Sequence, residues 1–276
     1  MKKEQLRLET RLRSAFGFSC LPFTKELKPH QIMKTPSFTE ALDKLRYLVD
    51  RRGTGVVFGA PGTGKSTLLR ALLTELCGTT HAAVYINDTT CTPTDLYRII
   101  ARGFGIEPPF KKSDILHAIK DRVLKLSRSK KLRPVLIIDE SHLLPAPFLD
   151  ELRILTNFDQ DSSDDLTLIL AGQPQLESTL RLSVNEALAQ RIIIRIRLRS
   201  FHQEEVQEYL TCRLEAAGRG APLFTPSAVE AIAKATRGVP RLIDRVAELS
   251  LLIALKTRRK EIDADIVTLA VDEVDP

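Results

Sequence analysis

The sequence is poor in cysteine and has no long apolar run. Its four cysteines, Cys20, Cys77, Cys91 and Cys212, are far apart and form no C-x-x-C pair. This spacing indicates neither a zinc site nor a disulfide framework, and we expect buried, reduced thiols. No apolar run comes near the roughly 18 residues that a membrane helix needs, and the first residues lack the apolar centre of a signal peptide. We therefore expect a cytoplasmic protein with no membrane partner.

The sequence also lacks a strong excess of either charge. Lysine and arginine number 41 against 35 acids, which gives a formal net charge of +6. This excess permits a basic face that attracts phosphate backbones, although it does not demonstrate one. A chain of 276 residues with 43% hydrophobic and 28% charged residues is typical of a soluble globular protein with one large domain, or a large domain and a smaller partner.

Apolar patterns divide the chain into three parts. Residues 1–35 mix basic and apolar side chains with Pro22 and Pro29, which predicts an extended N-terminal arm. Residues 36–200 alternate strand-like and helix-like segments, as in an α/β domain whose mostly parallel sheet is covered by helices. The strand-like segments are 55–59, 82–87, 134–139, 166–172 and 192–198. Residues 201–276 contain only helical patterns, near 203–217, 226–236, 240–257 and 263–273, and predict a helical subdomain.

The strand-like segment 192–198 differs from the other four. Its apolar residues Ile192, Ile194, Ile196 and Leu198 share one parity, and Arg195 and Arg197 share the other. Successive side chains of a strand point to opposite faces of the sheet. The alternation therefore predicts a half-exposed edge strand.

The stretch FGAPGTGKST, residues 58–67, matches the phosphate-binding pattern G-x-x-x-x-G-K-[ST]. An apolar strand precedes it and an amphipathic helix follows, an arrangement that aims backbone N–H groups and a helix N-terminus at phosphate. Lys65 can reach the β and γ phosphates, and Ser66 can ligate Mg²⁺. The alternative is a glycine turn with a purely structural role. We expect ATP to be bound by Gly59, Pro61, Gly62, Thr63, Gly64, Lys65, Ser66 and Thr67, together with Asp139.

The stretch VLIIDE supplies the acids that such a site needs. It is a buried apolar strand that ends in Asp139, followed by Glu140. We expect Asp139 to hold Mg²⁺ through water and Glu140 to polarise the attacking water. The predicted cofactors are ATP and Mg²⁺, and the predicted reaction is hydrolysis of ATP to ADP and phosphate.

Five stretches together resemble one family: GAPGTGKST, VLIIDESHLL, LTLILAGQPQLESTL, LAQRI and GVPRLID. They are similar to the AAA+ ATPases of bacterial transposition systems, of the TniB and TnsC type, and to relatives in secretion pathways, of the ExeA type. The resemblance covers roughly residues 16–257. It implies a P-loop AAA+ core with a five-stranded sheet and a helical lid, ATP bound between protomers, and assembly into rings or helical filaments.

The resemblance also implies further catalytic residues. Gln173 falls at the sensor 1 position, where relatives often have asparagine, and Arg241 falls at sensor 2. Arg191 corresponds to the arginine finger that enters a neighbouring subunit's site, with Arg181 as the competing candidate. For each arginine the alternative is an ordinary surface charge. We expect His142 to pack after the acidic pair, not to take part in catalysis.

The resemblance implies a regulator of DNA transposition. ATP-bound protomers would assemble on duplex DNA through its backbone, recruit or activate a transposase or target-selection protein, and hydrolyse ATP to disassemble. Phosphate contacts of this kind have little sequence preference. The expected contacts are Lys111, Lys112, Lys120 and Arg122, supported by the basic arm residues Lys2, Lys3, Arg7, Arg11 and Arg13. The alternative for each is a solvated helix face.

Two other functions remain open. A secretion-pathway ATPase of the ExeA type is one of them, but such relatives ordinarily continue into a membrane helix and a cell-wall-binding domain that this chain lacks. We therefore expect it less. The other function is a scaffold NTPase in which the nucleotide acts as a conformational switch.

Overall fold

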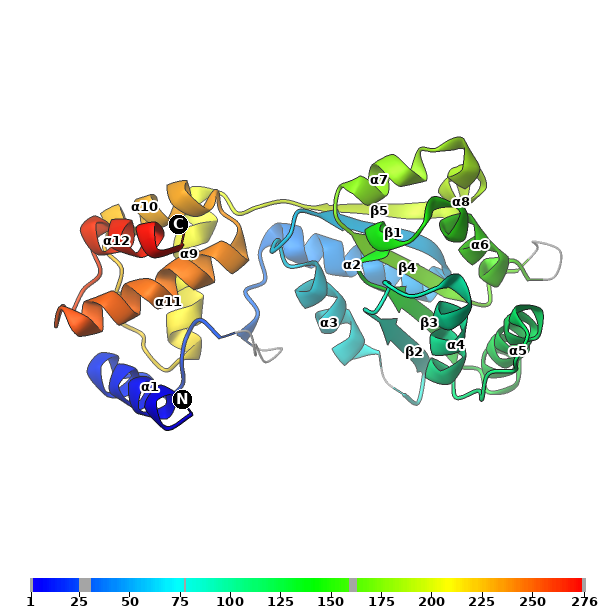
Figure 1. Ribbon diagram of the computed structural model, residues 1–276, viewed down its shortest axis with the longest axis horizontal. Coiled ribbons are helices and arrows are strands. Elements are labelled where there is room, and N and C mark those ends of the chain that lie inside the picture. Colours follow the sequence, from blue (N-terminus) through cyan, green and yellow to red (C-terminus); the bar gives the residue numbers. More distant parts are fainter. Residues whose placement is uncertain (1, 25–30, 77, 159–162, 275–276) are drawn as a thin grey trace. The chain divides into compact units, whose positions relative to one another are not determined.

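A computed structural model describes residues 2–24, 31–76, 78–158 and 163–274 (Figure 1). The chain forms two compact units, residues 36–198 and a second unit that combines residues 1–35 with 199–276. We call these the sheet unit and the helical unit, and each is described by itself. Within the described ranges no helix has both the length and the apolar character needed to cross a membrane.

The sheet unit contains a five-stranded sheet with the order β2-β3-β4-β1-β5, and all neighbouring strands are parallel. The predicted parallel sheet is therefore confirmed. Because the strands run in the same direction, the loops after their carboxyl ends lie along one edge. The strands are β1 (Gly53–Gly59), β2 (His81–Ile86), β3 (Arg133–Ile138), β4 (Thr167–Gly172) and β5 (Ile192–Leu198).

Burial along the strands follows their place in the sheet. Every residue of the central strands β1 and β4 is buried. In the edge strand β5, Ile196 is buried whereas Arg195 and Arg197 are exposed, which confirms the predicted half-exposed edge. Strand β2 forms the other edge, and Tyr85 is 37% exposed there.

Helices cover both faces of this sheet. Alternate strand residues point to opposite faces, so Leu136 and Leu168 belong to one apolar cluster while Val135 and Ile169 belong to another. The second cluster includes side chains of α2 and α3, and the first includes α4, α5 and α6. The helices are α2 (Pro36–Arg51), α3 (Lys65–Glu75), α4 (Pro93–Gly103), α5 (Lys112–Leu124), α6 (Ala146–Thr156), α7 (Gln175–Leu180) and α8 (Glu186–Arg191).

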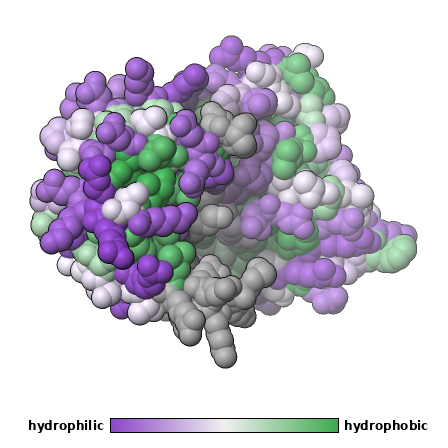
Figure 2. All heavy atoms as spheres, turned by 60° about the vertical axis from the view of Figure 1, so that its left-hand side comes forward, coloured by the Kyte–Doolittle hydropathy of each residue, from purple (hydrophilic) through white to green (hydrophobic). Residues whose placement is uncertain are grey.

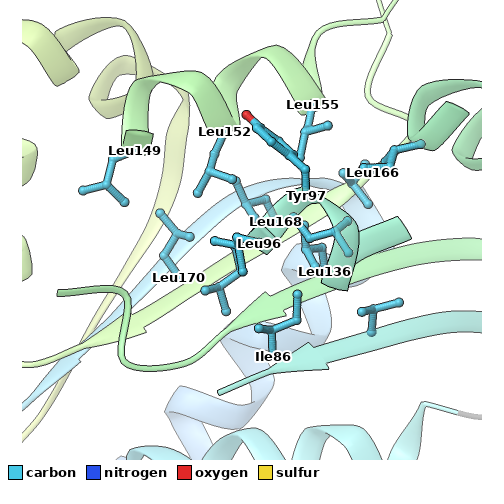
Figure 3. Close-up of a cluster of buried hydrophobic side chains, with 14 of the residues drawn as sticks. Ile86, Leu96, Tyr97, Leu136, Leu149, Leu152, Leu155, Leu166, Leu168 and Leu170 are labelled. Carbon is cyan, nitrogen blue, oxygen red and sulfur yellow. The ribbon is translucent and has the colours of Figure 1, made fainter. Parts of the chain in front are cut away.

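The first of these clusters contains Tyr97 of α4, whose ring meets that of Phe148 of α6 edge-on at 5.3 Å. Figure 3 shows Tyr97 among Leu152 and Leu155 of α6, above Leu136 and Leu168 of the sheet. All of these side chains are at most 2% exposed. Burial of a leucine side chain contributes about 1.5–3 kcal/mol to stability, so this packing fixes α4 and α6 on the sheet.

The helical unit contains α1 (Lys2–Phe16), α9 (Gln203–Ala216), α10 (Pro226–Thr236), α11 (Pro240–Lys256) and α12 (Ala264–Val274). The four C-terminal helices lie where the sequence predicts them. In the view of Figure 2 the surface is mostly hydrophilic with some hydrophobic patches, and the exposed large apolar residues of this unit include Leu8, Leu242 and Leu269. Single apolar residues on a surface are common and need no partner.

The prediction of an extended arm for residues 1–35 is wrong. Residues Lys2–Phe16 form α1, and Leu12, Phe16 and Phe23 are buried in the core of the helical unit. Leu12 and Phe16 are four residues apart, so they share one face of a helix and can be buried together. The backbone N–H of Ser19 also donates to Ala217 O at 2.8 Å. The side chains of the predicted arm residues Lys2, Lys3 and Arg7 lie outside the described part of the structure.

A buried arginine ties the segment after α1 to α9 and α11. Arg213 is 1% exposed, and its guanidinium donates to Thr24 O at 2.8 Å and lies 3.6 Å from a carboxylate oxygen of Asp244. Tyr209 donates to the same oxygen of Asp244 at 2.9 Å. Burial raises the pKa of Asp244 to about 6, although Arg213 and the hydrogen bond from Tyr209 act to lower it. Ionisation of Asp244 therefore lowers the stability of the helical unit.

The prediction of buried thiols is wrong for the three cysteines that the structure describes. They are unpaired, but Cys20 is exposed and Cys91 and Cys212 are partly exposed. Cys20 lies in the turn after α1 and Cys212 lies on α9, while Cys91 precedes α4 and packs partly against the apolar cluster of the sheet unit. Cys77 lies outside the described residues.

Candidate nucleotide-binding site

The glycine loop joins β1 to α3, and two of its glycines have backbone conformations that few other residues adopt. Gly62 has a φ of 82° and Gly64 a φ of 98°, both in the left-handed region. Gly64 directly precedes Lys65, the first residue of α3. The N–H groups of the first helical turn have no acceptor inside the helix, and the helix dipole makes this end positive. The loop therefore has the geometry to bind phosphate.

Gly59 is required for a different reason, because a side chain there would have no room. A Cβ atom would lie 2.5 Å from Thr63 Oγ1 and 3.3 Å from both Leu198 Cβ and Lys65 Cγ. The hydroxyl of Thr63 donates to Ala60 O at 2.8 Å and ties the middle of the loop to its start. The loop is therefore closed tightly over the end of β1.

Lys65 lies inside this loop. The residue is only 6% exposed, and its ammonium donates to Gly59 O at 2.8 Å and to Ala60 O at 3.2 Å. Burying a positive charge costs free energy that carbonyl dipoles only partly offset. Phosphate oxygens placed over the loop would add the negative charge that Lys65 favours. Lys65 is therefore positioned to bind a nucleotide's phosphates.

Ser66 and Asp139 meet at the carboxyl edge of the sheet. The Ser66 hydroxyl donates to Asp139 Oδ2 at 2.9 Å, although the two residues are 73 positions apart in the chain. Asp139 is 2% exposed, and its Oδ1 accepts the backbone N–H of Glu140 at 2.9 Å. A hydroxyl and a carboxylate are the oxygen ligands that Mg²⁺ prefers. These two residues fit the magnesium ion that accompanies a nucleoside triphosphate.

Glu140 follows Asp139 in a strained backbone conformation. Its φ of 52° and ψ of 31° lie in the left-handed region, which is uncommon for a residue other than glycine. The buried hydroxyl of Thr89 donates to Glu140 O at 3.2 Å and supports this turn. The Glu140 side chain is 40% exposed. Strain of this kind is found at functional sites, and here it turns a carboxylate toward water next to the Ser66–Asp139 pair.

His142 packs below this turn. Its side chain is 9% exposed, and Nδ1 lies 3.4 Å from Glu140 Oε2 without the geometry of a hydrogen bond. A Cβ atom on Gly172 of β4 would lie 3.0 Å from the backbone nitrogen of His142. The residue is thus enclosed between the acidic turn and β4, as a packing role requires.

Sequence reasoning missed Tyr85, which also contacts the acidic pair. Its hydroxyl donates to Asp139 Oδ2 at 2.8 Å. Desolvation of the phenol, followed by this hydrogen bond, raises the pKa of Tyr85 above its usual value. In the sequence, Tyr85 is only a residue with a polar hydroxyl in a predicted strand. A single sequence does not reveal that this strand pairs with the strand leading to Asp139.

Comparison with known proteins agrees with this geometry. Residues 48–180 match the model of a family described as AAA domain. This part of the chain is therefore similar to an AAA domain. It is 34% identical over 264 residues to general secretion pathway protein A of Aeromonas hydrophila. The match covers 94% of this chain but only 48% of that protein, so the chain spans about half the length of this relative.

Solved structures show the same AAA+ fold at low sequence identity. Cdc6p from Pyrobaculum aerophilum has a TM-score of 0.72 at 21% identity, with 92% of this chain and 70% of that chain covered. The Aeropyrum pernix ORC2 protein has a TM-score of 0.66 at 20% identity, with 91% and 71% covered. The Thermotoga maritima RuvB branch migration motor has a TM-score of 0.57 at 19% identity, with 88% and 70% covered. The predicted P-loop AAA+ fold is thus confirmed.

The other catalytic residues predicted for the AAA+ domain lie on separate elements. Gln173 follows β4 directly and is partly buried, and its carbonyl accepts the N–H of Leu176 at 2.9 Å. Arg241 is the second residue of α11 and belongs to the helical unit. Sensor roles for both residues stay predictions.

The two candidate finger arginines have different surroundings. Arg191 is the last residue of α8 and is partly exposed. Arg181 follows α7, and its side chain is 76% exposed and pairs with Glu177 at 2.8 Å. Glu177 also binds Arg197 of β5 at 2.5 Å, so Arg181 shares its acidic partner. The finger role stays a prediction for both arginines.

Three of the four predicted DNA-contact residues are engaged inside the sheet unit. Lys112 pairs with Glu151 at 2.7 Å. Lys120 donates to Asn157 O at 3.1 Å, and burial lowers its pKa. Arg122 donates to Phe104 O at 2.9 Å, whereas Lys111 is exposed just before α5. Because Lys112, Lys120 and Arg122 already have partners, they are less available to phosphates than side chains on a fully solvated helix face would be.

Proposed function

We propose that the chain binds ATP with Mg²⁺ and hydrolyses it, and that it serves as the ATPase part of a secretion-pathway protein similar to the Aeromonas relative. The observation that carries the first statement is the hydrogen bond between Ser66 and Asp139, with Glu140 directly beside it. This bond brings a phosphate loop, a magnesium-binding pair and a candidate base to one edge of the sheet. An ordinary structural glycine turn requires none of these.

Each residue has a distinct task in the proposed reaction. Lys65 and the loop N–H groups orient the β and γ phosphates, and Ser66 and Asp139 hold the metal, which neutralises charge on the phosphates when bound. Glu140 orients a water molecule and accepts its proton as the water oxygen attacks the γ phosphorus. The bond from that phosphorus to the bridging oxygen breaks, and ADP and inorganic phosphate leave. Gln173 and Arg241 would contact the γ phosphate, in keeping with the sensor positions that the resemblance assigns.

The proposed reaction is tested by measuring phosphate release and nucleotide affinity in parallel. Glu140→Gln keeps the shape of the side chain but removes the base, so the rate should fall about 100-fold or more, while ATP affinity changes less than about three-fold because the proposed task of the Glu140 side chain is on the water and not on the phosphates. Glu107→Gln, at an exposed loop position, is the matched control. A wild-type chain that releases no phosphate with Mg²⁺, or a Glu140→Gln variant as fast as the control, contradicts the proposal.

The secretion role has more support than the transposition role. It rests on the 34% identity over 94% of this chain to a protein named for secretion. The transposition role rested on the resemblance and on basic residues, and three of those residues pair within the sheet unit. Some structural neighbours, among them the Aeropyrum pernix ORC1 protein, were solved in complex with DNA, but their likeness to this chain concerns the fold.

A genetic experiment separates the two roles. Lys65→Ala introduced into the gene in its source organism should reduce the export of secreted proteins and leave transposition frequency unchanged. The reverse result, normal export and an altered transposition frequency, would contradict the secretion role and favour a role in regulating transposition. The Glu107→Gln allele again controls for an exposed substitution that leaves the fold intact.

A further inference from the structure

Tyr85 and Ser66 converge on a single oxygen of Asp139. The Tyr85 hydroxyl donates to Asp139 Oδ2 at 2.8 Å, and the Ser66 hydroxyl donates to the same atom at 2.9 Å. The other oxygen, Oδ1, accepts the N–H of Glu140 at 2.9 Å. Three donors from three segments therefore fix both the place and the rotation of this carboxylate.

The register of the sheet explains why a tyrosine reaches this atom. Tyr85 pairs with Ile137, two residues before Asp139, on the neighbouring strand β3. The backbone N–H of Asp139 donates to Ile86 O at 2.7 Å, which continues the pairing of β2 and β3 beyond Ile138. Residues two apart on a strand point to the same face, so the long phenol of Tyr85 extends along that face to the carboxylate.

We propose that Tyr85 is a positioning residue of the magnesium site, which holds the Asp139 carboxylate in the orientation that accepts the hydrated metal. This inference rests on the proposed binding of ATP with Mg²⁺. Ser66 would have a second task there, because its oxygen would also be a ligand of the metal, whereas Tyr85 would only hold the Asp139 carboxylate. Groups that orient a metal ligand in this way affect metal affinity although they never touch the metal.

A purely structural role for Tyr85 does not account for its position. The residue is 37% exposed on an edge strand, while its neighbours Val84 and Ile86 are 6% and 3% exposed and supply the packing of β2. A tyrosine used for packing would present its ring to a core and its hydroxyl to water. Here the hydroxyl contacts a carboxylate that is 2% exposed.

The test measures magnesium dependence separately from nucleotide affinity. A fluorescent ATP analogue is titrated into the full chain without metal and at rising Mg²⁺ concentrations, for wild type, Tyr85→Phe and the control Tyr47→Phe, which removes an exposed phenol from α2. We expect the Mg²⁺ midpoint to rise about ten-fold in Tyr85→Phe, with metal-free affinity unchanged. The control should match wild type in both measurements.

The outcomes distinguish this inference from the proposed function. If wild type shows no magnesium-dependent binding, the proposed function itself fails. If wild type binds normally and Tyr85→Phe has the same Mg²⁺ midpoint, the role of Tyr85 is refuted and the proposed function stands. Reversible partial unfolding of the variant would weaken metal-free binding of the nucleotide as well, so an unchanged metal-free affinity excludes unfolding as the cause of a raised Mg²⁺ midpoint. A loss of metal-free and metal-dependent affinity in equal proportion would indicate a structural role and also refute the inference.

Discussion

Substitution of Gly59 by alanine tests whether the loop geometry is as tight as the structure indicates. The new Cβ would lie 2.5 Å from Thr63 Oγ1, far inside normal contact, and 3.3 Å from Leu198 Cβ and Lys65 Cγ. Leu198 belongs to the neighbouring strand β5 and Lys65 is buried, so neither can move far. Thr63 must therefore rotate away and give up its hydrogen bond to Ala60.

The expected cost follows from these contacts. Overpacking a close-packed site costs about 1–3 kcal/mol, and the lost hydrogen bond adds about 1 kcal/mol. A total of about 3 kcal/mol corresponds to a fall in Tm of roughly 6–12 °C for a domain of this size. ATP affinity should fall at least about ten-fold, which corresponds to 1.4 kcal/mol, because rotation of Thr63 breaks its bond to Ala60 and opens the phosphate-binding loop.

Alanine variants of two further glycines separate the effect of overpacking from the effect of backbone strain. Gly78 has open space around its Cβ position and an ordinary φ, so Gly78→Ala should leave Tm and ATP affinity unchanged. Gly64 also has open space but a φ of 98°, so Gly64→Ala tests backbone strain alone, at about 1–2 kcal/mol. Thermal melts and calorimetric ATP titrations give both quantities. A Gly59→Ala variant as stable and as tightly binding as Gly78→Ala would refute the reasoning.

Two other predictions concern the assembly and the helical unit. Arg191→Ala should lose ATP turnover and regain it when mixed with Lys65→Ala, whose own arginine remains; without such rescue, Arg181 or a site within one subunit would be indicated. The raised pKa of Asp244, about 6, means that the folded chain binds this proton more tightly than the unfolded chain, so stability falls as the pH rises. Denaturant unfolding should show that the free energy of unfolding of wild type, relative to that of Asp244→Asn, falls by on the order of 2 kcal/mol between about pH 4.5 and 7. A stability difference that does not vary with pH would contradict the burial of Asp244.

The position of the candidate nucleotide site could be predicted from the sequence because the main parts of this site are local. The loop from Gly59 to Lys65 carries its own signals, and Asp139 ends an apolar strand of obvious character. In a parallel sheet such ends share one edge, which is why Ser66 and Asp139 could be expected near each other. The five predicted strands match the sheet for the same reason, and the strand at 192–198 matches β5 residue for residue.

The features that sequence reasoning missed depend on tertiary contacts. Pro22 and Pro29 suggested an extended arm, yet Leu12 and Phe16 bury against the helical unit and keep α1 folded. The contact of Tyr85 with Asp139 depends on which strands are neighbours, and one sequence does not specify strand order. The pairing of Lys112 with Glu151 likewise joins α5 to α6 and gives a partner to a lysine that the sequence leaves on an apparently free basic face. Each of these contacts joins segments that are far apart in the sequence, so the sequence alone does not reveal it.

The central claim is that the loop at the end of β1 binds the phosphates of ATP through Lys65. Calorimetric titration of ATP with Mg²⁺ into the full chain tests it most directly, with Lys65→Ala and the exposed control Lys44→Ala measured alongside. We expect saturable binding of one nucleotide per chain by wild type and by the control. Affinity should fall at least about ten-fold in Lys65→Ala, since a charge-assisted hydrogen bond contributes about 1.5–3 kcal/mol. No binding by wild type, or equal affinity in Lys65→Ala, would contradict the claim.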